Sequence, residues 1–344
     1  MSVLTIETRG DLTENFHSGC IAVVSEKGLV ASAGNWQEPC FYRSSSKPIQ
    51  ALPVLLLGLD KLYGLSDMEC AMLAGSIAGE QHHTDLILSL MEKTGITEDD
   101  LIMLPKYPDH PATANRLIRE GAAPRKIYHG CTPKHIALML VQRYLTGSVK
   151  NYHRIESAAQ RMVRYTISLF TDTPYADIKI GVDGCGVPVF GVPGDKIALS
   201  YLRLADPSLI PEAGFAAAAK RMTELMHRYP KYLRGDEYIC SLLNYDENIV
   251  AKGGAASVYA FALKKEKLGF MFKLYDGNET SWQIIIKELL RQFAPETCAE
   301  MIEKLESTDL IGFTRQYIRC ATGEIIGEMK PVFKLDLHNP ALTI

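Results

Sequence analysis

The distribution of β-prone and helical segments along the chain is the feature that most constrains its fold. Near the N-terminus, "CIAVVSEKGLVASAG" contains two β-prone runs separated by "SEKG", which predicts a hairpin with strands near 19–24 and 29–33. Apolar residues then recur with helical spacing until about residue 170. β-prone runs return in "ADIKIGVDGCGVPVFG", "ENIVAKGGAASVYAFAL", "GFMFKLYDGN" and "GEIIGEMKPVFKL", with helical segments among them. We therefore expect an α/β (α+β) fold: a mixed sheet flanked by helices, residues 1–45 and 171–344, plus a mainly helical domain, residues 46–170.

Composition and charge limit the partners of such a chain. With 344 residues, 47% of them hydrophobic, the chain can bury a sizeable core. A net charge of -3 without a run of Lys or Arg gives no basic surface, so we expect neither nucleic acid nor membrane as a partner. The N-terminus lacks a signal-peptide pattern, and the longest apolar stretch, "ALPVLLLGL", is far short of the roughly 20 residues that span a bilayer. We expect a cytoplasmic protein whose eight scattered cysteines are thiols.

The stretch "RSSSKPIQ" places Ser44 three residues before Lys47. If the segment is helical, the two side chains share a face and the lysine amine can reach the hydroxyl. A lysine activates a serine only when desolvation or a neighbouring cation lowers its pKa enough to leave the amine neutral. The alternative is a plain helix start, with a serine as N-cap and Pro48 in the first turn. Only Ser44 has the required spacing, since Ser45 and Ser46 do not face Lys47 in a helix.

Two glycine-rich turns carry further polar side chains. In "GSIAGEQHH", Ser76 lies beside a glycine before Glu80, and such a turn either admits an oxyanion or merely ends a helix. His82 and His83 are expected to be solvated, because adjacent histidines do not face one ion in a helix. In "IVAKGG", Lys252 ends a strand and either lines a cleft or is solvated.

Two cysteines lie in turns beside regular structure. Cys131 precedes a helix in "GCTPKH", where the helix N-terminus lowers a thiol pKa, so a thiolate nucleophile or a metal ligand is possible. Lys134 and His135 follow it. Cys185 lies in "DGCG", and Asp183 before it either orients a ligand or closes an Asx-turn. Single cysteines are a weaker zinc signal than paired C-x-x-C motifs.

Taken in order, "RSSSKPIQ", "GSIAGE", "GCTPKH", "DGCGVP" and "AKGGAAS" resemble the rhizobial-type L-asparaginase family, also called the asparaginase II family, from about residue 19 onward. The resemblance implies a fold similar to serine β-lactamases and serine-dependent glutaminases, hydrolysis of L-asparagine to L-aspartate and ammonia, and commonly a homodimer. It implies two serine–lysine pairs: Ser44 with Lys47, and Ser76 with Lys252. It also implies a zinc ion, completed by water, on three side chains: Cys131, Lys134 and Cys185.

The roles that follow are expectations. Ser44 is the nucleophile and Lys47 its base, while Ser76 and Lys252 relay protons, position water or exchange roles with them. The zinc, which is near the substrate in the resembled family, would fix the charged end of the substrate or orient groups. Further substrate or supporting contacts are expected from four side chains: Arg43, Glu80, His135 and Asp183. Several neighbours of these positions depart from the family pattern, including Gly130 in place of an asparagine, so the surrounding pocket is changed.

Two other functions remain open from the sequence. A β-lactamase or penicillin-binding-like acyl enzyme shares S-x-x-K and "KGG", although no S-D-N element stands in the expected place. A non-catalytic protein that binds zinc or an amino acid is the alternative outside enzymology.

Overall fold

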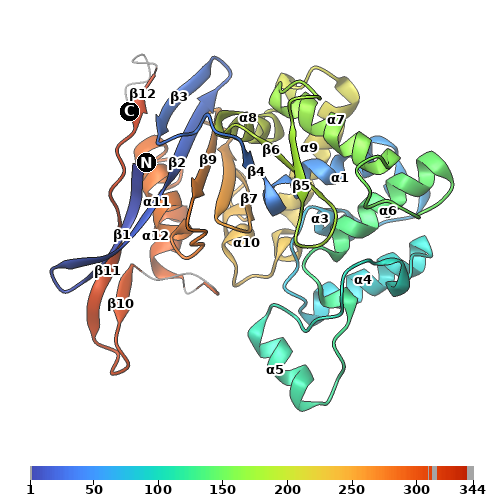
Figure 1. Ribbon diagram of the computed structural model, residues 1–344, viewed down its shortest axis with the longest axis horizontal. Coiled ribbons are helices and arrows are strands. Elements are labelled where there is room, and N and C mark those ends of the chain that lie inside the picture. The colour runs from blue at the N-terminus through green and yellow to red at the C-terminus, as the bar shows by residue number, and fades with distance from the viewer. Residues whose placement is uncertain (1, 309, 312–315, 339–344) are drawn as a thin grey trace. The chain divides into compact units, whose positions relative to one another are not determined.

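The computed structural model describes residues 2–308, 310–311 and 316–338 (Figure 1). The chain forms two compact units. Unit 1 comprises residues 1–45, 192–206 and 237–344, and unit 2 comprises residues 46–191 and 207–236. This differs from the predicted division, in which residues 171–236 stay with the sheet. Residues 171–191 and 207–236 instead pack within the helical unit, to which they contribute a β-hairpin and a long helix.

Unit 1 is built on an antiparallel sheet. The strand order is β10-β11-β1-β2-β9-β8-β7, with β3 paired to β2 and β12 to β3, and the pairings among these described strands are antiparallel. The predicted N-terminal hairpin is confirmed as β2 and β3. The elements of the unit are β1 Ser2–Arg9, β2 Leu12–Ser25, β3 Gly28–Ala33, β4 Cys40–Phe41, α8 Gly194–Ala205, α10 Ile239–Asn244, β7 Ile249–Gly254, β8 Val258–Leu263, β9 Leu268–Leu274, α11 Trp282–Phe293, α12 Ala299–Ser307, β10 Tyr317–Arg319, β11 Ile325–Pro331 and β12 Asp336–Leu337.

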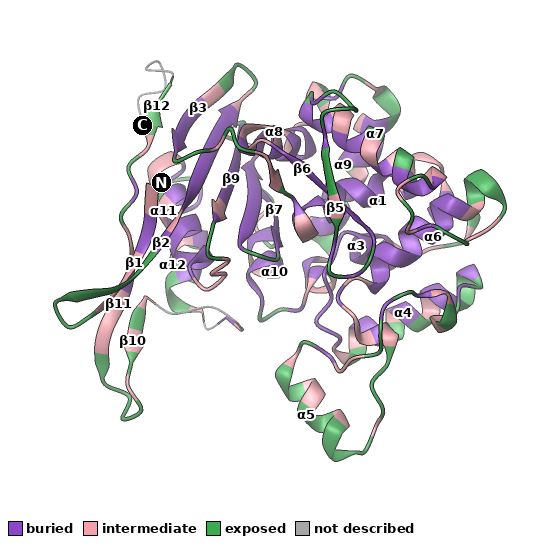
Figure 2. Ribbon diagram, in the orientation of Figure 1, coloured by how far each residue is buried: buried purple, intermediate pink, exposed green. Residues whose placement is uncertain are grey.

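The two faces of this sheet carry different residues. Successive strand residues point to opposite faces. On β9, Phe270 and Phe272 join the apolar core that α10, α11 and α12 complete. Gly269 faces the other way, toward α8, where a Cβ would lie 2.2 Å from the Ala198 carbonyl oxygen, so only glycine lets α8 approach this closely. The central strands are buried along both faces (Figure 2). The predicted fold class, a sheet flanked by helices with a mainly helical part, is confirmed.

Unit 2 is mainly helical. Its elements are α1 Lys47–Leu56, α2 Leu59–Leu62, α3 Asp67–Leu73, α4 Gln81–Thr94, η2 Glu98–Asp100, α5 Pro111–Arg119, η3 Lys126–Tyr128, α6 Thr132–Thr146, α7 Ala158–Thr171, β5 Lys179–Val182, β6 Pro188–Val192, η4 Pro207–Leu209, α9 Ala213–Arg228 and η5 Pro230–Leu233; η1 Arg43–Ser46 leads into α1. Local signals explain the helix ends. Ser66 and Glu69 form a capping box at the start of α3, and Gly95 ends α4 in the left-handed conformation.

The hairpin of β5 and β6 is the non-helical part of unit 2 that matters for the site. Its strands pair from Lys179 opposite Gly191 to Val182 opposite Pro188. The turn between them contains Asp183 and Cys185, and the Asp183 N–H donates to the Val187 carbonyl at 2.8 Å. The hairpin therefore presents both residues from one tight turn.

All eight cysteines are free thiols, as the sequence predicted. Among the residues that the structure describes, no helix is both long and apolar enough to cross a membrane.

Candidate active site

Lys47 is a basic residue that is almost fully buried in unit 2. Its side chain is buried, with 1% of the residue exposed, at the start of α1. The amine Nζ donates to Ser76 Oγ at 2.8 Å and to the Gly130 carbonyl at 2.8 Å. A lysine amine hydrogen-bonded to a serine hydroxyl is the geometry that a base and its nucleophile require.

The surroundings of Lys47 favour the neutral amine. Burial lowers the pKa of Lys47, and the charge of Lys134 acts in the same direction. The anionic charge of Cys131 and Asp183 raises this pKa, but the net pKa lies below the ordinary 10.5. The sequence argument required a pKa lowered by desolvation, and the structure supplies it.

Ser76 lies in a segment held by neighbouring backbone. The segment between α3 and α4 has no helical or strand hydrogen bonding of its own. The Ser76 N–H donates to the Leu233 carbonyl at 2.7 Å, and a Cβ on Gly75 would lie 2.8 Å from that same oxygen. Gly75 is therefore needed for the close approach that places Ser76 against Lys47, and the turn is more than a helix end.

The two predicted cysteines meet in unit 2. Ligand atoms of Cys131, Asp183 and Cys185 all lie within 4.8 Å of one another. Cys185 Sγ lies 3.4 Å from Asp183 Oδ2, and Lys134 Nζ donates to the same oxygen at 3.0 Å. Two thiols, a carboxylate and an amine are thus gathered at the start of α6 and in the β5–β6 turn. The three predicted ligands come together, and Asp183 joins them.

The ionisable side chains of this cluster have pKa values shifted in different directions. A hydrogen bond from the Cys185 thiol and the charges of Lys47 and Lys134 hold the pKa of Cys131 well below its usual range, against the effect of burial. The bond to Cys131 and burial raise the pKa of Cys185. Burial lowers the pKa of Lys134, but the charges of Cys131, Cys185 and Asp183 outweigh it and raise the pKa overall. Cys131 is therefore the thiolate, and Lys134 is its cation.

His135 follows Lys134 on α6 and is fully buried. Its Nδ1 is paired with the Tyr152 hydroxyl at 2.8 Å, whereas Nε2 has no hydrogen-bond partner. Burial and the charge of Lys134 lower the pKa of His135, so the ring is neutral and Nε2 is open to a ligand or to water. Tyr152 is a site residue that the sequence analysis missed, because its "NYH" context has no motif.

Ser44 and Arg43 belong to unit 1. Arg43 has a φ of 51° in the left-handed region, which a non-glycine side chain adopts at a cost. The Ser45 hydroxyl donates to the Tyr42 carbonyl at 2.6 Å, so Ser45 is scaffold, as predicted. Ser46 occupies the N-cap position of α1, but its side chain makes no capping hydrogen bond. Capping by a serine side chain therefore does not explain the triple serine.

Lys252 lies in β7 of unit 1, and of the two interpretations left open by the sequence, the solvated strand-end lysine is wrong. Its residue is 1% exposed, and Nζ donates to the Gly253 carbonyl at 2.9 Å. The sulfur of Cys240 lies 4.0 Å from that Nζ and accepts from the Gly253 N–H at 3.2 Å. A Cβ on Gly254 would lie 3.0 Å from the Ser44 backbone nitrogen. The glycines after Lys252 therefore let β7 reach the Ser44 backbone.

Cys240 is a second residue that sequence analysis missed. It received no role because an isolated buried cysteine usually serves as a small apolar residue. Its place under Lys252 depends on the packing of α10 against β7, which no local pattern encodes.

His82 and His83 differ from expectation, whereas the supporting role expected of Glu80 stays a prediction. His83 is fully buried rather than solvated, and His82 is partly buried. Ligand atoms of the three residues lie within 4.8 Å of one another, so adjacent histidines do converge here. Glu80 is the residue before α4, in extended backbone, which allows its carboxylate to turn back toward the first helical turn.

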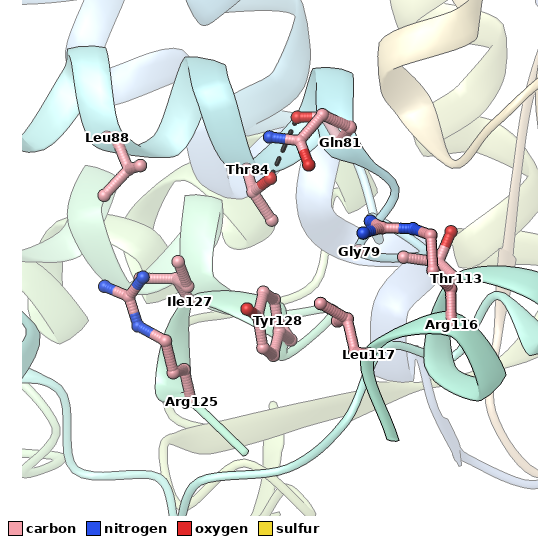
Figure 3. Close-up of a pocket in the computed structure, with 10 residues that line it drawn as sticks. All are labelled: Gly79, Gln81, Thr84, Leu88, Thr113, Arg116, Leu117, Arg125, Ile127 and Tyr128. Carbon is pink, nitrogen blue, oxygen red and sulfur yellow. Dashed lines mark hydrogen bonds between the residues drawn. The ribbon is translucent and has the colours of Figure 1, made fainter. Parts of the chain in front are cut away.

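A small cavity of about 100 Å³ lies beside α4 in unit 2 (Figure 3). Its lining includes Gln81 and Thr84 of α4, together with two arginines. Arg116 is paired with Glu120 at 2.9 Å and Arg125 with Glu98 at 2.8 Å, so neither offers a free charge to an anion. The residues that line the cavity include none of the predicted site residues, and it has no part in the chemistry proposed below.

A buried lysine bonded to a serine hydroxyl is typical of enzymes that use a serine nucleophile and a lysine base. A model of the L-asparaginase II family matches residues 6–331, and the chain therefore belongs to this family. The resemblance drawn from the motifs is confirmed, and family membership makes the protein an amidohydrolase.

Two solved structures are similar to the chain. A β-lactamase from Mycobacterium bovis has 15% identity and a TM-score of 0.42, with 80% of this chain and 95% of that chain covered. A probable glutaminase from Bacillus subtilis, complexed with 6-diazo-5-oxo-L-norleucine, has 16% identity and a TM-score of 0.34, with 80% and 84% covered. Likeness at this level says nothing about substrate. None of the curated proteins matches the sequence.

Proposed function

We propose that the protein is an L-asparaginase that hydrolyses the side-chain amide of L-asparagine through an acyl-enzyme. The observation that carries the mechanism is the buried Lys47 amine, whose pKa is lowered and which lies 2.8 Å from the Ser76 hydroxyl oxygen. The choice of L-asparagine rests on the family to which the chain belongs.

The chemistry proceeds in two halves. A serine Oγ attacks the amide carbon, and its proton passes to the neutral Lys47 amine. The protonated lysine then gives this proton to the leaving nitrogen, which departs as ammonia and leaves an ester. Water hydrolyses the ester, releases aspartate and restores the serine. Backbone N–H groups beside the attacked serine would stabilise the oxyanion.

Two serines compete for the role of nucleophile. Ser44 remains the predicted nucleophile, because it has the S-x-x-K spacing and β7 packs its glycines against the Ser44 backbone. Ser76 is the second candidate, since its hydroxyl already accepts a hydrogen bond from Lys47. In the first case Ser76 relays the proton, and Lys252 supports Ser44. In the second case Ser76 is the nucleophile and Ser44 relays the proton.

A direct test separates these assignments. We expect ammonia release from L-asparagine by the wild-type protein and its loss in Ser44→Ala and Lys47→Ala. Acid-quenched reaction mixtures, digested and analysed by mass spectrometry, should carry an aspartyl ester on the Ser44 peptide. An ester on the Ser76 peptide would reverse the two serines. Full activity in Ser44→Ala, Ser76→Ala and Lys47→Ala would refute the serine–lysine mechanism.

Zinc is the proposed cofactor, and the residues present suit it. Two cysteine sulfurs and an Asp183 oxygen within 4.8 Å of one another form a donor set that zinc prefers. Cys131 and Cys185 would hold the ion, with Lys134 or Asp183 as the third ligand. Lys134 is protonated in its ion pair with Asp183, so its ligation would release a proton, whereas ligation by Asp183 would not. When bound, the ion would supply positive charge for the substrate carboxylate.

Metal analysis of variants tests this site. We expect about one zinc per chain to disappear in Cys131→Ser and in Cys185→Ser. Comparison of Lys134→Met with Asp183→Asn then identifies the third ligand. A zinc stoichiometry unchanged from wild type in both cysteine variants would show that the cysteine cluster does not bind it.

The alternatives each have a distinguishing measurement. Covalent labelling by a penicillin would favour a penicillin-binding or β-lactamase-like acyl enzyme. Calorimetric binding of asparagine without ammonia release would favour an amino-acid-binding protein that has lost turnover. The homodimer and the cytoplasmic location stay predictions.

A further inference from the structure

Three imidazole nitrogens at the start of α4 are buried without a hydrogen-bond partner: His82 Nε2, His83 Nδ1 and His83 Nε2. The Lys231 backbone is close enough to act on the pKa of both rings, but none of the three nitrogens makes a hydrogen bond of normal geometry. Buried polar atoms in native proteins nearly always have a partner, so this group requires either a water or an ion. Neither ring has a role in the asparaginase chemistry proposed above.

The three side chains converge at this position. Glu80 Oε2 lies 3.8 Å from His83 Nδ1, and the two imidazole centroids are 4.0 Å apart with a 38° angle between their planes. One ligand atom from each of Glu80, His82 and His83 lies within 4.8 Å of the others. Zinc ligands at about 2.0–2.2 Å from the ion lie roughly 3.3 Å from each other, so modest side-chain rotation would suffice to close the site.

The charges around the two rings are mixed. Burial disfavours the charged imidazolium form, and a neutral imidazole keeps one lone pair for a metal ion. Lys231 and the positive end of α4 oppose a cation. The Glu80 carboxylate, whose Oε2 lies 3.8 Å from His83 Nδ1, and the negative charges of Asp85 and Asp236 act in the opposite direction.

We propose that Glu80, His82 and His83 form a second binding site, separate from the cysteine cluster, for a divalent transition-metal ion of the zinc type. Two imidazoles and one carboxylate suit zinc and its first-row neighbours, whereas magnesium and calcium require oxygen ligands. Three protein ligands leave a fourth position for water.

The site would join the irregular segment between α3 and α4 to the start of α4. Glu80 is the last residue of the segment that carries Ser76, and this segment is held by backbone bonds such as Ala78 N–H to the Arg234 carbonyl at 3.1 Å. The ring of Tyr232 meets both imidazoles edge-on, at 5.5 Å from His82 and 6.4 Å from His83. Metal binding would therefore tie the Ser76 segment to α4, and we expect it to raise the thermal stability of the protein.

The test uses zinc itself and does not depend on asparaginase activity. In a Cys131→Ser/Cys185→Ser background, which removes the thiolates, we expect titration calorimetry and metal analysis to find about one zinc per chain. Adding His83→Ala should abolish this binding, whereas His227→Ala, a histidine of α9 outside the cluster, should leave it unchanged. Cobalt in the same background should give weak visible bands without the near-ultraviolet thiolate band.

Three results would overturn the proposal. One is the absence of zinc binding in a folded protein that carries Cys131→Ser and Cys185→Ser. The second is unchanged binding after His83→Ala, and the third is a thiolate band that accounts for all bound cobalt. If the double-serine background does not fold, the same comparison is made in the protein with its cysteines intact. There His82→Ala, at the less buried position, must lower the stoichiometry from about two zinc ions to about one, and an unchanged stoichiometry refutes the site.

Discussion

Replacement of Lys47 by methionine should separate catalysis from stability. Methionine keeps the approximate volume of the buried side chain but removes the amine that lies 2.8 Å from Ser76 Oγ. If Lys47 is the general base, kcat/KM should fall by about 10²–10⁴-fold, the usual contribution of such a group. At 1.36 kcal/mol per factor of ten, this loss corresponds to roughly 3–5 kcal/mol of transition-state stabilisation.

The effect of this substitution on folding should be much smaller. The buried Gly130 carbonyl loses its donor, at a cost of about 1–3 kcal/mol. The substitution also removes the desolvation of the buried polar amine, which costs free energy in the wild-type protein. These effects oppose one another, so we expect the free energy of unfolding to change by no more than about 2 kcal/mol.

Assays of ammonia release and urea unfolding across pH test this reasoning. Wild-type activity should rise with pH through a pKa below 10.5, as Lys47 loses its proton. Wild-type stability should also rise with pH between the folded pKa and 10.5, because the unfolded chain then binds more protons than the folded chain. Both slopes should flatten in Lys47→Met. Lys287→Met is the matched control, since Lys287 is another buried lysine with a pKa lowered by burial, bonded to Gln316. Equal loss of activity in both variants would refute a specific role for Lys47.

Three further substitutions have defined outcomes. Gly254→Ala puts a Cβ 2.5 Å from the Tyr42 carbonyl oxygen and should lower kcat/KM about 10²-fold by displacing Ser44, whereas Gly214→Ala, which meets only a Leu56 methyl, should leave kcat/KM unchanged. Glu69→Gln removes the carboxylate charge that pairs with Lys93 at 2.6 Å, and urea unfolding should show a loss of about 2 kcal/mol. Burial raises the pKa of Glu69, but the bonds from Lys93 and Ser66 outweigh it, so wild-type stability should be lost as pH falls below 4.5 and this loss should be absent from the variant. Cys240→Ala leaves the Gly253 N–H without its sulfur acceptor and should lower kcat more than it changes KM, while Cys298→Ala, at another buried thiol, should change neither.

Sequence patterns gave the correct elements where local chemistry decides them. Ser66 and Glu69 carry the S-x-x-E pattern of the capping box that they form, Gly95 ends its helix, and the predicted turn at 25–28 joins two strands. Paired glycines permit a close backbone approach, and at Gly254, the second glycine after Lys252, the structure shows that approach to Tyr42 and Ser44.

Contacts between distant segments were not predictable in this way. The bond from Lys47 to Ser76 joins residues 29 apart, and the approach of Asp183 to Lys134 joins residues 49 apart. The family resemblance identified these residues as site residues. It paired Ser76 with Lys252 rather than with Lys47, and it did not predict the contact between Asp183 and Lys134. The burial of His83 depends on Tyr232 and its neighbours, which reach α4 only through the tertiary fold.

The arrangement around Gly130 links the base to the cysteine cluster. The Gly130 carbonyl accepts from Lys47, and the next residue is Cys131. A Cβ at this position would lie 3.1 Å from the Ile77 carbonyl, so glycine accommodates the close approach of the Ser76 segment where the family pattern has an asparagine. The anionic charge of Cys131 and Asp183 now raises the pKa of Lys47 against the effect of burial. A dication held by those same groups would cancel that charge, leaving burial to lower the pKa of Lys47 further. Zinc could therefore increase the fraction of neutral base without touching the reacting atoms.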